Sequence, residues 1–333
     1  MQALYVNSAT AHELNALTLG EQPQPQPAAD EVLVRVHAVG LNPVDYKLVE
    51  EGNTNWQFPH IFGLDVTGEV VTTGAAVTGF KAGERVFYHG DLTKNGGFAK
   101  YAVVKSYAVA KMPTGLSYEQ AAALLCGAMT AYAAVYRKAN LTNRHSVLIH
   151  AGAGGVGGIA IQLVKQIGLT VYTTVSARKR AFVQSLQPDH IIDYQTTDVT
   201  ATIKELTQGL GVDLIINTIG STEATADLQR LAYNGALVTI VGEPDLSHYD
   251  LGHYDLGRYG QSVLSVNLGG AHQSHNPQQQ ADLATMATAL GELVATKKLD
   301  PMIDHVLSFE QIPQGLQALK QHLISGKLVA RID

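Results

Sequence analysis

The sequence predicts an α/β protein in two parts, a small antiparallel β-barrel followed by a doubly wound parallel sheet. Residues 31–113 contain short strand-like runs separated by Gly, Pro and Asp, as is typical of small barrels. From Ser146 onward, apolar strand runs alternate with helix-like stretches, the order that builds a parallel sheet. Residues 147–168 join a strand, a glycine cluster and an apolar helix in the order of a dinucleotide-binding fold.

The strands of the first part are predicted from the alternation of apolar and polar residues. This alternation is clearest at residues 31–37. Further β-rich runs lie at residues 65–73, 85–88 and 98–110. Because turn-forming residues follow each run, we expect the strands to pair in an antiparallel way.

The second part contains six apolar runs with helical stretches between most of them. Beyond about residue 278, the pattern predicts a helix through Thr296, a strand at 305–309, a second helix and a final strand at 328–332. We expect this tail to return to the first domain, with the ligand cleft between the two domains. The predicted domains are 1–121, 122–272 and 273–333. The six candidate strands are 147–150, 169–175, 190–194, 212–219, 236–241 and 262–268.

The glycine cluster between the first of these strands and its helix predicts a dinucleotide site. Glycines allow a sharp turn and a close approach to a pyrophosphate, and the following helix directs its free amides at the phosphates. The alternative is a tight turn without a ligand. The glycines are Gly152, Gly154, Gly155, Gly157 and Gly158.

The composition is that of a globular protein, with 333 residues of which 46% are hydrophobic and 16% charged. The net charge of −6 and the absence of a basic tract argue against nucleic acid or an anionic membrane as a partner. Cys126 is the single cysteine, so an internal disulfide is excluded. With no secretory signal and no apolar stretch of about 20 residues, we expect a cytoplasmic protein.

The segment after the second strand predicts a preference for NADPH. NAD-binding sheets usually place an Asp or Glu about 20 residues beyond the glycine turn, where it binds the ribose hydroxyls. No acidic residue lies between Glu119 and Asp189, and this segment carries Ser176 and Arg178. A hydroxyl and a cation suit the 2′-phosphate of NADP, with Lys179 as the alternative cation. The other interpretation is a solvated helix start with incidental basic residues.

Several motifs together resemble the medium-chain dehydrogenase/reductase superfamily, and within it the zinc-independent quinone oxidoreductase branch. The order and spacing of the motifs carry the resemblance over essentially the whole length. It implies a GroES-like β-barrel catalytic domain, a Rossmann domain, and hydride transfer from NADPH to a quinone or an activated alkene. The motifs are GLNPVDYK (40–47), GLDVTG (63–68), AGERV (82–86), GGFAKY (96–101), the segment 126–132, the glycine turn, IIDY (191–194) and GKLV (326–329).

The residues at the zinc positions of this family predict a metal-free protein. Catalytic-zinc relatives use a Cys where this chain has Asn42, a His-Glu pair where it has Leu64 and Asp65, and a Cys that is retained as Cys126. One thiolate without a second Cys or His cannot hold zinc. The structural-zinc lobe of such relatives corresponds to residues 88–97, which contain no cysteine. We expect ordinary surface or core roles for His89 and the other histidines.

We predict that Asn42 and Tyr46 line the substrate side, with Tyr46 able to donate a hydrogen bond to the acceptor oxygen. Asp45 is an alternative contributor, because its position assists the site in zinc relatives, although a structural hydrogen bond is an equal interpretation. Conjugated acceptors need no Lewis acid, since the hydride places charge on a distant oxygen that a hydrogen bond can neutralise.

The resemblance also implies a set of cofactor contacts beyond the segment 176–179. Most of them follow strands at the carboxyl edge of the sheet. The sixth strand is the edge at which relatives join sheets, so we expect a homodimer. The implied residues are Thr130, Gly154, Gly155, Val156, Tyr194, Thr218, Val241, Gly242, Leu268 and Gly269.

Three functions remain open from the sequence. The first is an NADPH-dependent quinone reductase, the second a reductase of enals and enones, and the third an NADPH-binding structural or regulatory protein with little turnover. A YDLG unit occurs twice, at 249–252 and 254–257, which suits either a mobile aromatic lid or a duplicated surface loop. The acceptor itself is not encoded in any single motif.

Overall fold

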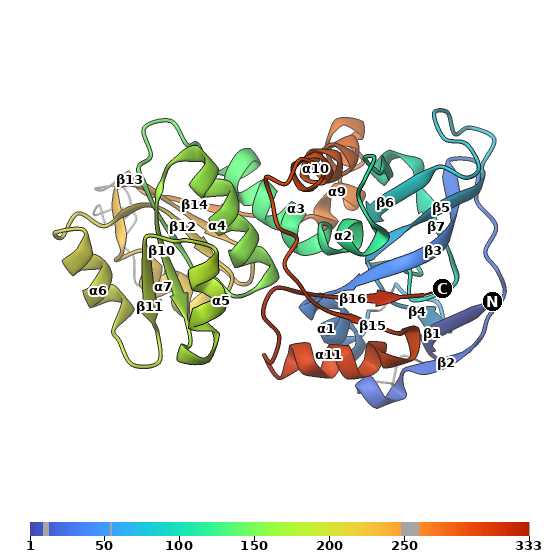
Figure 1. Cartoon of the computed structure of the whole chain (residues 1–333), viewed down its shortest axis with the longest axis horizontal. Coiled ribbons are helices and arrows are strands. Elements are labelled where there is room, and N and C mark those ends of the chain that lie inside the picture. The colour runs from blue at the N-terminus through green and yellow to red at the C-terminus, as the bar shows by residue number, and fades with distance from the viewer. Residues whose placement is uncertain (9–12, 54, 248–259, 333) are drawn as a thin grey trace. The chain divides into compact units, whose positions relative to one another are not determined.

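The computed structural model describes residues 1–8, 13–53, 55–247 and 260–332, and the chain forms two compact units (Figure 1). Unit 1 comprises Met1–Met129 and Leu268–Asp333, and unit 2 comprises Thr130–Asn267. The YDLG repeat at 249–257 lies outside the described residues. Both predicted sheet types are present, which confirms the α/β class with a barrel-like unit and a Rossmann unit.

Unit 1 is built on a seven-stranded sheet with the order β15-β16-β3-β5-β6-β8, in which β7 also pairs with β3. All pairs are antiparallel except that of β15 with β16. A smaller sheet has the order β2-β1-β4. The strands are β1 (Gln2–Val6), β2 (Thr18–Glu21), β3 (Glu31–Leu41), β4 (His60–Ile61), β5 (Asp65–Thr73), β6 (Arg85–His89), β7 (Tyr101–Lys105), β8 (Ala110–Lys111), β15 (Ile303–Leu307) and β16 (Lys327–Arg331).

The last strand of the chain lies beside one of the first. In Figure 1 the red strand β16 runs next to the blue strand β3, and Leu328 pairs with Leu41. This register brings Lys327 to the end of β3, where Asn42 begins the next helix. Gly40 has no room for a side chain there, because a Cβ would lie 2.4 Å from the Ala122 carbonyl oxygen. Unit 1 therefore packs its backbones tightly around the start of that helix.

Two helices of unit 1 pack against its larger sheet. Helix α2 contacts β3, β5 and β16, and α10 contacts β6 and β8. Helix α3 begins in unit 1 and continues into unit 2. The helices are α1 (Pro43–Glu51), α2 (Tyr118–Ala123), α3 (Cys126–Ala133), α9 (Gly269–Gln273), α10 (Pro277–Ala295) and α11 (Ile312–Lys320), with short 3-10 turns at Leu14–Ala16, Ser106–Ala108 and Phe309–Gln311.

Unit 2 is a parallel sheet with the strand order β11-β10-β9-β12-β13-β14, the arrangement of a dinucleotide-binding fold. Its apolar strands are buried by helices packed against them. The elements are a π-helix at Ala134–Lys138, β9 (Ser146–Ile149), α4 (Gly155–Ile167), β10 (Thr170–Val175), a 3-10 turn at Ala177–Lys179, α5 (Arg180–Ser185), β11 (His190–Asp193), α6 (Val199–Leu206), β12 (Val212–Asn217), α7 (Ser221–Asp227), β13 (Leu231–Thr239) and β14 (Ser262–Ser265).

The predicted strands exist, but some bounds differ. The sixth strand was expected to reach residue 268, yet β14 ends at Ser265, because its neighbour β13 ends at the paired residue Thr239. The run 98–110 is interrupted by a 3-10 turn and forms two strands, β7 and β8, which pair with different neighbours. Among the described residues, no helix has the length and apolar character needed to cross a membrane.

Candidate active site

The carboxyl ends of the parallel strands in unit 2 bring most of the predicted cofactor residues to one edge. Parallel strands end at the same side of their sheet, so residues that follow them are neighbours in space although they are distant in sequence. The residues in question are Gly154, Gly155 and Val156 after β9, Ser176, Arg178 and Lys179 after β10, Tyr194 after β11, Thr218 after β12, and Val241 and Gly242 after β13.

The glycine turn owes its shape to close packing rather than to left-handed glycines. The residue with a positive φ is Ala151, at 51°, and none of the cluster glycines has one. A Cβ on Gly152 would lie 2.3 Å from the Thr173 hydroxyl, and one on Gly157 would lie 2.4 Å from the Ala151 carbonyl oxygen. Glycine is needed at these two positions because the backbone of the turn and of α4 approaches its neighbours closely.

The first amides of α4 are available to an anion. Gly154, which precedes the helix, already donates its N–H to the Ala151 carbonyl oxygen at 2.8 Å. The amides of Gly155 and Val156 occupy the first two helical positions, which have no carbonyl partner within a helix. Among Gly154, Gly155 and Val156, the last two therefore have backbone amides without a partner inside the helix.

The basic segment after β10 lies at the surface, where a 2′-phosphate would be accessible. Ser176 precedes the 3-10 turn and accepts the Lys179 backbone N–H at 3.0 Å through its carbonyl oxygen. Arg178 is exposed, and Ser176 and Lys179 are half-buried. Tyr194, at the end of the neighbouring strand, is 55% exposed. A half-exposed aromatic ring can stack on an adenine, and Tyr194 follows the strand that pairs with β10.

The remaining predicted contacts are divided between the strand ends and the helices. The Thr218 hydroxyl donates to the His150 carbonyl oxygen at 3.2 Å, which ties the ends of β12 and β9 together. Thr130 is a buried residue of α3. Leu268 and Gly269 were expected to end the sixth strand. They lie instead at the start of α9, within unit 1. The chain turns into this helix soon after β14 ends.

Unit 1 contains a buried charged cluster around Asn42. The Lys327 ammonium contacts Asp65 Oδ2 at 2.9 Å, the Leu41 carbonyl oxygen at 3.3 Å, and Asn42 Oδ1. Asn42 Nδ2 donates to Asp65 Oδ2 at 2.8 Å, and Asp65 Oδ1 accepts the Cys126 backbone N–H at 2.8 Å. Asn42, Asp65 and Lys327 are all at least 95% buried. Lys327 belongs to the GKLV motif, but no pattern in the sequence indicated a role for its side chain.

Asp45 joins this cluster at the start of α1. Its Oδ2 accepts the Asn42 backbone N–H at 2.8 Å, whereas its Oδ1 is buried with no partner among the described residues. Burial, and next the negative charge of Asp65, raise the pKa of Asp45 to about 7. Near neutral pH this carboxyl group can therefore hold or release a proton.

Tyr46 is not linked to the cluster by any hydrogen bond that the described residues show. Burial, and next the charge of Glu50, raise the pKa of its hydroxyl, while Lys320 opposes this shift. Glu50 and Lys320 form an ion pair between α1 and α11. The structure therefore brings Asn42 and Asp45 together and gives Tyr46 a different set of charged neighbours.

His89 and Cys126 complete the surroundings of Asp65. One ligand atom from each of Asp65, His89 and Cys126 lies within 4.8 Å of the others. Burial lowers the pKa of His89 to about 4, and its Nδ1 has no partner in the described parts of the chain. Burial also raises the pKa of the Cys126 thiol. Sequence spacing gave no sign of this grouping, because β5, β6 and α3 meet only in the folded barrel.

Comparison with known proteins identifies the family. Residues 28–114 match the alcohol dehydrogenase GroES-like domain, and residues 155–283 match the zinc-binding dehydrogenase domain. The NAD(P)H oxidoreductase RTN4IP1, mitochondrial, of Danio rerio is 32% identical over 91% of this chain and 84% of that protein. The quinone oxidoreductase-like protein 2 homolog of Nematostella vectensis is 29% identical over 90% of this chain and 81% of that protein.

A solved quinone oxidoreductase structure from Pseudomonas syringae pv. Tomato DC3000 has a TM-score of 0.87 at 26% identity and covers 100% of both chains. The chain belongs to the medium-chain dehydrogenase/reductase superfamily. It falls in the quinone oxidoreductase-like branch, as the motifs indicated, and is an oxidoreductase enzyme.

The match to a zinc-binding dehydrogenase domain raises the question of whether the residues of this chain could bind zinc. Asn42 and Leu64 are not zinc ligands, and Cys126 is the one remaining family thiol. The alternative group of Asp65, His89 and Cys126 faces a competing cation, since Lys327 contacts Asp65 directly. Both oxygens of Asp65 are already hydrogen-bonded. The residues present therefore do not fit a zinc ion.

A second buried polar network lies beneath the glycine turn of unit 2. His150 Nε2 is 2.8 Å from Asp227 Oδ1, and His150 Nδ1 is 3.1 Å from the Thr174 hydroxyl. Arg230 donates to Asp227 Oδ1 at 2.7 Å and also pairs with Glu223. His150, Glu223 and Asp227 are grouped closely enough to bind a metal, but the Arg230 guanidinium already pairs with both carboxylates.

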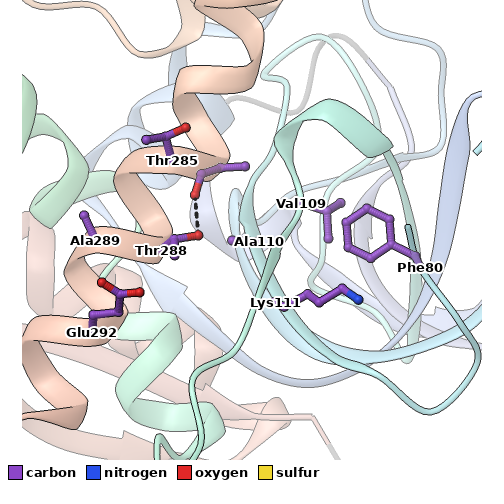
Figure 2. Close-up of a pocket in the computed structure, with 9 residues that line it drawn as sticks. Phe80, Val109, Ala110, Lys111, Thr285, Thr288, Ala289 and Glu292 are labelled. Atoms are coloured by element: carbon purple, nitrogen blue, oxygen red, sulfur yellow. Dashed lines mark hydrogen bonds between the residues drawn. The ribbon is translucent and has the colours of Figure 1, made fainter. Parts of the chain in front are cut away.

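The groove in Figure 2 is separate from these predicted residues. It has a volume of about 520 Å³ and lies in unit 1 between the segment Val109–Lys111 and helix α10. The Thr288 hydroxyl donates to the Ala284 carbonyl oxygen at 2.8 Å, and Lys111 pairs with Glu84 at 2.7 Å. The groove contains none of the predicted catalytic or cofactor residues, and these polar groups are already engaged.

Proposed function

We propose that this oxidoreductase transfers a hydride from NADPH to a quinone and that it does so without zinc. The observation that carries the proposal is the buried cluster of Asn42, Asp45, Asp65 and Lys327. In it, Asn42 and Asp65 occupy two of the positions at which zinc-dependent relatives have metal ligands, and the Lys327 ammonium contacts both. Such a cluster can stabilise a negative oxygen but cannot supply the Lewis acid that alcohol oxidation requires.

The choice of NADPH over NADH rests on the segment after β10. Ser176, Arg178 and Lys179 supply a hydroxyl and two cations, and no carboxylate follows this strand to bind a ribose 2′-hydroxyl. Phosphate carries two charges and three acceptor oxygens, which match these groups. The free amides of Gly155 and Val156 would bind the pyrophosphate at the positive end of α4.

NADPH, when bound, supplies the hydride, and the residues of unit 1 manage the charge that results. A quinone that accepts a hydride at one end of its conjugated system becomes a hydroquinone anion, with the charge on oxygen. Asn42 can donate an N–H to this oxygen, and Asp45, with a pKa of about 7, can deliver the proton that completes the hydroquinone. Asp45 then regains a proton from water. Tyr46 remains the alternative donor of a hydrogen bond.

The experiment is a survey of electron acceptors. The purified protein is mixed with NADPH, and the loss of absorbance is followed with a quinone, an enal and a simple ketone. We expect rapid oxidation with the quinone and none with the ketone. A faster reaction with the enal would replace the quinone by an activated alkene as the substrate.

Tight NADPH binding without oxidation by any acceptor would support the third function, a binding protein with little turnover.

We also propose that the protein forms a homodimer through β14, which is the edge strand of the described sheet in unit 2. Its mass in solution tests this directly. A monomer at micromolar concentration would contradict the proposal.

A further inference from the structure

We propose that the Lys327 ammonium takes the place of a metal ion in this site: it orients the Asn42 amide as a hydrogen-bond donor and excludes metal from the Asp65, His89 and Cys126 group. The first half rests on the proposed function, because it concerns an acceptor oxygen. The second half does not, because metal binding can be measured without any substrate.

The position of the ammonium is fixed from three sides. An ammonium group has three N–H donors, and here the acceptors are the Leu41 carbonyl oxygen, Asn42 Oδ1 and Asp65 Oδ2. Lys327 is the first residue of β16, and the pairing of Leu328 with Leu41 sets its place along β3. Its side chain is 5% exposed. The cation therefore belongs to the rigid sheet rather than to a mobile surface side chain.

This arrangement determines which way the Asn42 amide points. An ammonium can only donate and a carboxylate can only accept, so the amide oxygen must face Lys327 and the amide nitrogen must face Asp65. Exchanging the two would place an NH₂ group against the ammonium and an oxygen against the carboxylate. Of the two N–H groups of Asn42, one is used by Asp65. The other can only donate, so an oxygen of an acceptor molecule is a group that it can bind.

The same cation opposes metal binding. Asp65 Oδ1 accepts the Cys126 amide and Asp65 Oδ2 is shared between Asn42 and Lys327, so neither oxygen is free for a metal. The positive charge of Lys327 also acts on His89 and on Cys126, the other two members of the group. A divalent ion would have to displace a tethered cation that is already paired with the carboxylate. Lys327 is thus a positioning residue for Asn42 and a barrier to zinc.

The metal half is tested by titrating the protein with Co²⁺ and following the thiolate-to-cobalt absorption. We expect no such band in the wild-type protein and about one equivalent bound in Lys327→Met, which removes the competing cation from Asp65 Oδ2. The band should disappear in Lys327→Met with Cys126→Ser. Lys320→Met is the matched control, since Lys320 pairs with Glu50 at the surface, and it should behave as the wild type.

Stoichiometric cobalt binding by the wild-type protein, with the thiolate band, would overturn the exclusion of metal. A folded Lys327→Met variant that binds no cobalt would overturn it as well. Because Lys327→Met leaves the Asp65 charge without its partner, the variant Asp65→Asn with Lys327→Met is prepared in parallel. It removes both charges together, and circular dichroism establishes that each variant is folded.

The positioning half is tested by a double-mutant cycle on quinone reduction. We expect Lys327→Met and Asn42→Ala each to lower kcat about 10- to 100-fold, with the KM for NADPH changed less than about twofold. Because Lys327 acts through Asn42, combining the two changes should cost no more than either alone. The Asp65→Asn with Lys327→Met variant should show the same loss of kcat while remaining folded.

Losses that multiply in the double variant would show that Lys327 acts independently of Asn42 and would overturn the positioning role. If the wild-type protein failed to oxidise NADPH with any of the acceptors, the proposed function would be wrong, and this half of the inference with it. The cobalt titration would still decide the metal half. The two failures are therefore distinguishable.

Discussion

The two units each contain a buried cluster of charges, and the clusters differ in how completely their hydrogen bonds are satisfied. In unit 2, Asp227 is bonded to His150, Arg230 and Asn217, so both of its oxygens have partners. In unit 1, Asp45 Oδ1 and His89 Nδ1 have none within the described ranges. The pKa of Asp45 is raised to about 7 and that of His89 is lowered to about 4.

The difference in hydrogen bonding suits a structural role for the cluster in unit 2 and ligand binding by the cluster in unit 1. A fully bonded network gains rigidity and leaves no group for a ligand, which suits the support of a cofactor turn. A buried polar atom without a partner costs free energy and is retained where a ligand supplies the missing bond. This difference fits a structural role for the His150 network and agrees with the proposed role of the Asn42 cluster in reducing the acceptor.

The largest effect should follow from breaking the satisfied network. Arg230→Met leaves the Asp227 carboxylate buried without its cation, so the free energy of unfolding should fall by about 3–5 kcal/mol. Urea denaturation measures this change. Arg35→Met, which removes an ion pair from an arginine with a 51% exposed side chain, is the control and should cost less than about 1 kcal/mol. Equal effects of the two changes would contradict the assignment of Arg230 to a buried structural network.

A change in the Asn42 cluster should raise the free energy of unfolding instead of lowering it. Asp45 has a folded pKa of about 7, above its ordinary value of 3.8, so its contribution to stability is fully present below pH 4 and is lost as the pH rises to 7. Asp45→Asn keeps an oxygen for the Asn42 N–H and removes the charge. At pH 7 and above it should raise the free energy of unfolding by about 2–4 kcal/mol, with little effect near pH 4.

Melting curves of both proteins between pH 4 and pH 8 test this prediction. The wild-type protein should lose stability relative to the variant as the pH rises, and the variant should lose quinone reductase activity even though it is more stable. A constant difference in stability across this range would show that Asp45 does not titrate within it.

The cofactor preference should depend on the surface of unit 2 and not on the network beneath it. Ser176→Asp with Arg178→Ala introduces an acceptor for the ribose hydroxyls and removes a cation, so the ratio of kcat/KM for NADPH to that for NADH should fall about 10- to 100-fold, or about 1.4–2.8 kcal/mol. Lys179→Ala tests the alternative cation. An unchanged ratio in the first variant, together with a large fall in the second, would move the 2′-phosphate contact to Lys179.

The smallest expected effect is on the free energy of unfolding at acidic pH. The folded pKa of His89 is about 4, below the ordinary 6.5, so the unfolded chain takes up a proton first as the pH falls. The His89 imidazole should therefore add a downward slope to the stability between pH 6.5 and pH 4, which amounts to about 1 kcal/mol at pH 5.5. His89→Gln should remove this slope, whereas His305→Gln at a side chain 70% exposed should not. Parallel slopes in His89→Gln and wild type would contradict the prediction.

Much of the fold was predictable because its signals are local. The β-rich run at 65–73 and the apolar run before the glycine turn correspond closely to β5 and β9. The end of β14 at Ser265 was not predictable, since it depends on where β13 ends. Nor was the role of Ala151, whose positive φ shapes the turn while the neighbouring glycines serve close packing.

The sequence alone determined the family and the two sheet types, because glycine spacing and apolar periodicity can be recognised in consecutive residues. The NADPH contact at Ser176 and Arg178 stays a prediction. Only the tertiary structure decided the chemistry of the Asn42 cluster. Lys327 reaches Asn42 from 285 residues away in the chain. The pKa of Asp45 depends on burial and on the charge of Asp65, and these properties arise only when distant strands pack together.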